Sequence, residues 1–170
     1  MYIQISQFES FLRTYINHTM VKHYGNNWHQ HQIMKDLAEF QSNKMLKIQK
    51  PSQALNSISF GTLELVYLNG SRFGNIFQSK LQINKILTKD GKPKYHNKDL
   101  IKNLFSIIRN ARNDICHHRR IGESIKSNPK YRKKKMTRSE VNKSLNDLKI
   151  LLGYDNQFDV VSVDFKYKKI

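Results

Sequence analysis

One amphipathic stretch, residues 98–121, constrains the fold more than any other part of the sequence. At about 100° per residue, a helix here gathers its apolar side chains on one side. These residues are Leu100, Ile101, Leu104, Ile107, Ile108, Ala111 and Ile115. The opposite side collects Arg109, Arg112, Asn113, Cys116, His117 and Arg120, whereas Asp114 falls outside that stripe. A solvated helix face usually mixes both signs of charge, so a basic stripe without a carboxylate indicates a specialised surface.

The charge balance of the 170-residue chain indicates a polyanionic partner. Its 30 Lys and Arg residues against 13 Asp and Glu give a net charge of +17. This excess favours nucleic acid first and an anionic membrane surface second. No run approaches the roughly 18 apolar residues of a membrane span, and no basic segment leads into an apolar one at the start. We therefore expect a cytoplasmic protein with no membrane partner.

The single cysteine, Cys116, excludes an internal disulfide and a zinc site built from several cysteines. His117 and His118 follow it directly, but adjacent residues on a helix point apart and no second cysteine or carboxylate completes a ligand set. We expect neither a metal nor another cofactor, and the cysteine content suits a reducing cytoplasm.

Helical spacing of apolar residues recurs along most of the chain. A first helix is predicted at about 6–22, where Ser6 and Glu9 resemble a capping box. Further helices are indicated at 33–45, 58–67, 72–88 and 141–152. The tail from Asp159 alternates β-branched residues, which favours a short C-terminal strand. The sequence thus predicts one all-α domain over residues 1–170, with a basic loop at about 122–138.

Three segments of the sequence match one known pattern, in the same order. They are Asn27-Trp28-His29, Ser59-Phe60-Gly61-Thr62-Leu63-Glu64-Leu65-Val66-Tyr67 and Arg112-Asn113-x-x-x-His117-His118-x-Arg120. The last resembles the signature of the HEPN ribonuclease superfamily, in particular of Abi-like abortive-infection proteins. The middle one resembles their F-G-T-L-x-x-x-Y segment, and the first their His-Trp region with the order altered. The resemblance implies a HEPN-like helical bundle that dimerises and cleaves RNA without a metal, using Arg112 and His117 at a shared interface.

The residue types of the last segment suit this chemistry. RNA carries its own nucleophile in the 2′-hydroxyl, so cleavage needs a proton acceptor, a proton donor and a cation for the phosphorane charge. His117 can transfer protons near neutral pH, and the Arg112 guanidinium binds phosphate as a fork. Asn113 lies four residues before His117 and can orient the imidazole. Arg112 and His117 lie about 140° apart around the helix axis, which favours a site built from two copies in a homodimer.

Further basic residues are candidates for contacts to the RNA. They are Arg109, Arg120, Lys126, Lys130, Arg132, Lys133, Lys134, Lys135 and Arg138. The run from 126 to 138 is typical of an RNA clamp, and its alternative interpretation is a solvated loop. His118 projects to the edge of the apolar face, so we expect a structural histidine there, with a supporting catalytic role as the alternative.

These observations predict a metal-independent endoribonuclease that cleaves single-stranded RNA and acts as a toxin or a phage-defence effector. One alternative is a non-catalytic RNA-binding module whose basic stripe and loop hold structured RNA. Another is a toxin held inactive by an RNA or protein antitoxin that covers the helix at 98–121.

Overall fold

The computed structural model describes residues 1–41, 47–48, 50–82, 85–92, 94, 98–119, 121 and 136–154. The elements, in chain order, are α1 (Tyr2–Tyr24), η1 (Trp28–Gln30), η2 (Gln32–Met34), α2 (Ala38–Gln41), α4 (Pro51–Ser57), α5 (Phe60–Leu68), α6 (Gly70–Arg72), η3 (Phe73–Phe77), η4 (Gln78–Lys80), α7 (Lys98–Cys116) and α9 (Arg138–Leu151). No strand occurs among these described residues, and the fold is all-α. The expected C-terminal strand and most of the basic loop, at 122–135, lie outside them.

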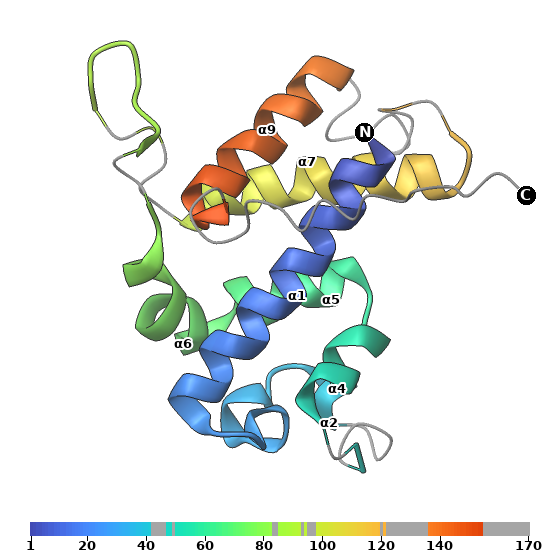
Figure 1. Cartoon of the computed structure of the whole chain (residues 1–170), viewed down its shortest axis with the longest axis vertical. Coiled ribbons are helices and arrows are strands. Elements are labelled where there is room, and N and C mark those ends of the chain that lie inside the picture. The colour runs from blue at the N-terminus through green and yellow to red at the C-terminus, as the bar shows by residue number, and fades with distance from the viewer. Residues whose placement is uncertain are drawn as a thin grey trace, which may run out of the picture.

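The long helix α1 is the central element of the bundle. It contacts α4, α5, α7 and α9. In Figure 1, α7 and α9 lie across one end of α1, and α2 and α4 lie near its other end. Helices α7 and α9 also pack directly against each other. This arrangement brings the start of α1 to the same end of the molecule as the C-terminal part of α7.

The amphipathic helix predicted around 98–121 is confirmed as α7. Its buried residues are Ile101, Leu104, Phe105, Ile108, Ala111 and Asp114. Leu100, Ile107 and Ile115 lie at the margin and are partly buried. The buried face is broader than predicted, since it takes in Phe105 and Asp114, because α1, α5 and α9 all pack against this helix.

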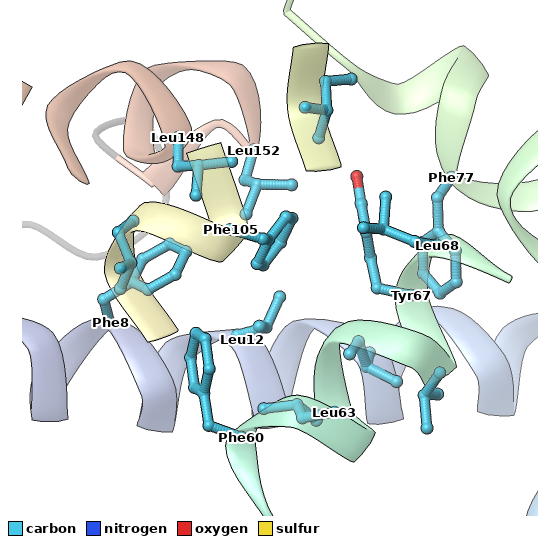
Figure 2. Packing of buried hydrophobic residues seen from close by; sticks show 14 of the residues in the cluster. Phe8, Leu12, Phe60, Leu63, Tyr67, Leu68, Phe77, Phe105, Leu148 and Leu152 are labelled. Atoms are coloured by element: carbon cyan, nitrogen blue, oxygen red, sulfur yellow. The ribbon is translucent and has the colours of Figure 1, made fainter. Parts of the chain in front are cut away.

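Phe105 is the point at which the aromatic core meets (Figure 2). Its ring centroid lies 6.3 Å from that of Phe8 in α1. On the side of α5, the corresponding distances are 6.4 Å to Phe60 and 5.5 Å to Tyr67. Figure 2 also shows Leu148 of α9 on the same side of the core as Phe105. The Phe105 ring of α7 thus packs against both α1 and α5.

Helix α1 begins at Tyr2, earlier than the sequence predicted. Ile5 is only 1% exposed, so the extra turn buries apolar surface that a start at residue 6 would leave in water. The capping box expected at Ser6 and Glu9 is wrong, because both residues lie inside the helix. Glu9 instead accepts a hydrogen bond from Arg13, one turn further along.

Two predicted helices are broken into shorter pieces. Among the described residues of the segment 33–45, which end at Gln41, only η2 and α2 are helical. The helical part of the segment 72–88 is interrupted after Lys80, at Leu81 and Gln82. The buried Arg72 accounts for part of this irregularity, since its guanidinium donates to Asp36 and to the backbone carbonyl of Ile33. A regular helix through Ile33 would use that carbonyl internally.

The helix predicted at 141–152 is confirmed as α9, and Gly153 follows its end with a positive φ of 71°. A capping box that the sequence analysis overlooked fixes its start. Thr137 Oγ1 accepts the Glu140 N–H at 3.2 Å, and the Glu140 carboxylate accepts the Thr137 N–H at 2.8 Å. The helix predicted at 58–67 is confirmed as α5.

Tyr67 brings a hydroxyl into the core that finds no hydrogen-bond partner among the described residues. Burial raises the pKa of Tyr67 well above its ordinary value of 10.0. Since an unpaired buried hydroxyl costs free energy, we expect Tyr67→Phe to raise the free energy of unfolding by about 1 kcal/mol at pH 7. Chemical denaturation measures this change, with Tyr2→Phe on the exposed surface as the matched control.

The same variant tests the pH dependence. Above about pH 10 the folded state keeps the Tyr67 proton while the unfolded chain loses it, so the wild type loses stability as the pH rises. The advantage of Tyr67→Phe should therefore grow between pH 7 and about pH 10.5. A variant that is less stable than the wild type at both pH values would contradict this account.

Candidate active site

The motif segment ends α7 instead of continuing it. The helix stops at Cys116, and the His118 N–H donates to the Ile115 carbonyl at 3.1 Å. The Arg119 N–H donates to the Asp114 carbonyl at 2.7 Å. Together these bonds form a Schellman ending, in which His118 takes a positive φ of 53°. The predicted extension of the helix to residue 121 is wrong, because this left-handed residue turns the chain away from the helix axis.

Both histidines of the motif are exposed. The expectation that His118 lies at the edge of the apolar face is wrong, because the helix ends before it. His117 stays close to the last turn, since its backbone N–H donates to the Asn113 carbonyl at 3.0 Å. The end of α7 therefore presents imidazoles to solvent beside the half-buried Asn113.

Arg112 lies in the last turns of α7, and its side chain is 35% exposed. Its Nε lies 3.6 Å from Oε2 of Glu9 in α1. Glu9 Oε1 in turn accepts a hydrogen bond of 2.5 Å from Arg13 Nη2. The basic stripe on α7 contains no carboxylate of its own. Glu9 of α1 supplies a carboxylate to it, and this contact orients the Arg112 guanidinium.

Arg109 links α7 to the F-G-T-L segment of α5. Its Nη1 donates to Glu64 Oε2 at 2.8 Å, and the Glu64 side chain is only 3% exposed. Burial raises the pKa of Glu64, and the positive charges of Arg109 and Lys102 oppose that rise. The Arg109 side chain also passes over Gly61, where a Cβ would lie 3.6 Å from its Cδ. Arg109, predicted as an RNA contact, has a buried structural partner, and its own side chain is 34% exposed.

The remaining residues of the F-G-T-L segment build α5 itself. Ser59 Oγ accepts the Thr62 N–H at 3.1 Å and so caps the helix. Thr62 Oγ1 donates to Glu39 Oε1 of α2 at 2.9 Å. Phe60 and Leu63 are buried in the core. The segment therefore positions α5 against α2 and α7.

Trp28 and His29 of the first matched segment are buried as well. Trp28 Nε1 donates to Asn17 Oδ1 at 3.1 Å, and His29 Nε2 lies 2.7 Å from the Ile48 carbonyl oxygen. These bonds attach the turn after α1 to its neighbours. Trp28 and His29 therefore stabilise the fold, and neither of them belongs to the exposed end of α7.

A cleft of about 220 Å³ lies beside Arg112. Its lining residues are Tyr2, Ile5, Ser6, Glu9, Ser10, Arg13, Arg112 and Cys116. Its walls are the first half of α1 and the last turns of α7, which lie at the same end of the molecule in Figure 1. From the sequence, only the residues of the α7 wall were expected to form a site. The spacing of Glu9 and Arg13, one helical turn apart, was the available signal for the other wall.

Of the other predicted RNA contacts, Arg138 begins α9 and is exposed. Those outside the described residues are Arg120, Lys126, Lys130, Arg132, Lys133, Lys134 and Lys135. Within the described ranges, no group of three or more His, Cys, Asp or Glu side chains is placed to hold a metal ion. No helix in that part of the chain is both long enough and apolar enough to cross a membrane.

Comparisons of the chain with protein families, with curated proteins and with solved structures find no match. The site geometry and the residues of the three motif segments are therefore the basis for the function of this protein.

His118 occupies a backbone conformation that favours glycine. An L-residue in the left-handed region costs roughly 1–2 kcal/mol, a cost that glycine avoids. We expect His118→Gly to raise the free energy of unfolding by about 1 kcal/mol, and His118→Val to lower it, because β-branched residues tolerate this region least. Urea denaturation of the two variants measures both effects. A less stable His118→Gly would show that the imidazole makes a stabilising contact of its own.

Proposed function

We propose that this protein is a metal-independent endoribonuclease that cleaves single-stranded RNA. The observation that carries the proposal is the grouping of Arg112, Asn113 and His117 at the solvent-facing end of α7, beside a cleft. A guanidinium, an amide and an imidazole are the groups needed for attack by the RNA 2′-hydroxyl. The Arg112 side chain is 35% exposed and contacts Glu9 at one edge of its guanidinium, so it is accessible to a phosphate.

In the proposed mechanism, His117 removes the proton from the 2′-hydroxyl, which attacks the adjacent phosphorus and displaces the 5′-oxygen. An imidazolium, supplied by the second copy of the chain, protonates that leaving oxygen. Arg112 donates to the non-bridging phosphate oxygens, where negative charge develops in the transition state. Asn113 orients the His117 imidazole. The products are a 2′,3′-cyclic phosphate and a 5′-hydroxyl.

The biological part of the proposal is a cytoplasmic toxin or phage-defence effector. Its support is the similarity of two segments, 59–67 and 112–120, to those of Abi-like HEPN proteins. These segments are far apart in the sequence, yet the bond between Arg109 and Glu64 joins their helices. An RNA or protein antitoxin that covers the exposed end of α7 would hold such an enzyme inactive.

The first functional prediction is cleavage in the absence of divalent metal. The protein should cut single-stranded RNA in EDTA and leave 2′,3′-cyclic phosphate ends, and a 2′-deoxy substitution at the cut site should block the reaction. Arg112→Ala and His117→Ala should each lower the rate by about 100-fold or more, the usual range for loss of acid–base or electrostatic catalysis. Gel analysis of end-labelled RNA and mass spectrometry of the ends measure these outcomes.

His23→Ala is the matched control, because His23 is an exposed histidine in the last turn of α1, at the opposite end of that helix from the cleft. Its rate should equal that of the wild type. Loss of all activity in EDTA, or equal cutting of DNA, would contradict the mechanism. RNA that is bound but never cut by folded protein would favour the non-catalytic RNA-binding module.

A further prediction concerns a second copy of the chain. Arg112 contacts Glu9 of α1, whereas His117 lies beyond the end of α7, so the two side chains of one chain point to different places. We therefore expect a homodimer in which His117 of one protomer approaches Arg112 of its partner. Arg112→Ala and His117→Ala protein, each inactive alone, should recover part of the activity when mixed, because a mixed dimer places one intact His117 opposite one intact Arg112. The recovery is partial because the second His117 is missing and water must protonate the leaving oxygen. Cleavage assays on the mixture and light scattering measure this. A strict monomer that still cuts RNA at nanomolar concentration would rule it out.

A further inference from the structure

The α1 wall of the cleft carries a polar stripe that the cleavage chemistry does not use. Tyr2, Ser6, Glu9 and Arg13 are spaced by four, three and four residues, which places them along one face of α1. All of them line the cleft, opposite Arg112 of α7. The stripe has an aromatic ring at the N-terminal end of α1 and a carboxylate two turns further along, and the carboxylate lies next to the guanidinium that we assign to the phosphate.

Glu9 is held in a fixed position within this wall. Arg13 donates to its Oε1 and also to the backbone carbonyls of Leu55 and Ile58, so the guanidinium is itself anchored to the C-terminal end of α4. Glu9 Oε2 lies 3.6 Å from Arg112 Nε, which is longer than a hydrogen bond. Among the described residues, this oxygen makes no hydrogen bond and keeps its acceptor capacity.

The charges of the cleft favour a neutral ligand group with N–H donors. A second phosphate in the cleft would meet the Glu9 carboxylate, while Arg13 and Arg112 are already in contact with that carboxylate. A nucleobase carries no charge, and its amino and imino groups donate to carboxylates. Tyr2 is 56% exposed, so its ring is available for a base to stack on.

We propose that this cleft binds a guanine base next to the scissile phosphate, with Glu9 Oε2 accepting hydrogen bonds from its N1–H and its 2-amino group. Guanine has two adjacent donors on its Watson–Crick edge. Uracil has a single donor between two carbonyl oxygens, which a carboxylate repels. Adenine and cytosine have an amino group beside an unprotonated ring nitrogen. The inference rests on the proposed function for the phosphate at Arg112, and it assigns the base specificity of that same site.

The test is a binding measurement that requires no cleavage. Short 2′-deoxy-blocked oligouridines carry guanine, inosine or uracil at one position, and fluorescence anisotropy measures their affinity for the full chain. Two hydrogen bonds to one edge of a base correspond to a discrimination of about tenfold, so guanine should bind about tenfold tighter than uracil. Inosine lacks the 2-amino group and should fall between them.

Glu9→Gln should remove the preference for guanine, because the amide replaces an acceptor with a donor. Asp90→Asn is the matched control, since Asp90 is an exposed carboxylate in the turn before α7, and it should keep the preference. Tyr2→Ala should weaken all three oligonucleotides alike. Circular dichroism of each variant verifies folding, and Tyr2→Ala tests the cleft even where Glu9→Gln does not fold.

Equal affinity for guanine, inosine and uracil in the wild type, or no binding at all, would overturn the proposal. A preference for guanine that survives in folded Glu9→Gln would overturn it as well. The outcome is distinguishable from failure of the proposed function. Guanine-selective binding without any cleavage would contradict the proposed enzymatic activity and support the guanine site. Cleavage without guanine selectivity would contradict the guanine site and support the enzymatic activity.

Discussion

Burial of the apolar face of α7 is the constraint on which the rest of the structure depends. Phe105 contacts Phe8 of α1 and two rings of α5, so the rotation of α7 about its own axis is fixed from both sides. A close-packed core does not tolerate a rotated helix, because every buried side chain would lose its partners. With that rotation set, Arg109 must face α5 and Arg112 must face α1. The position of the basic stripe is thus a consequence of the core.

The stripe divides into parts with different electrostatic roles. Glu64 is almost fully buried, and Arg109 offsets most of the cost of its charge, so loss of Arg109 would leave the buried carboxylate without this hydrogen-bond donor. Arg112 has a weaker and more exposed contact with Glu9, which orients it without enclosing it. His117, beyond the helix end, is exposed. One helix therefore presents a structural cation, an oriented cation and an accessible imidazole in succession.

The elements that the sequence predicted well are those in which local pattern and packing agree. Helices α7 and α9 have strong apolar periodicity, and Gly153 marks the end of α9. The start of α1 was misplaced because Ser6 and Glu9 imitate a cap, while the burial of Ile5 decides the boundary. The segment 33–45 does not form one regular helix, because the backbone carbonyl of Ile33 accepts a hydrogen bond from Arg72. This contact joins residues far apart in the sequence, so the local sequence pattern does not predict it.

The sequence by itself determined the all-α class, the burial of one face of α7 and the residue types at its end, since periodicity and composition depend only on neighbours along the chain. Only the tertiary structure decided which partners the arginines have. Glu9, Glu64 and Arg13 lie far from α7 in sequence and reach it through the packing of α1 and α5. It also decided that α7 ends at Cys116, because histidine at position 118 permits a left-handed residue without requiring one. Contacts between distant segments depend on how helices rotate and cross. Apolar spacing specifies which face of a helix is buried, but it does not specify which other helix packs against that face.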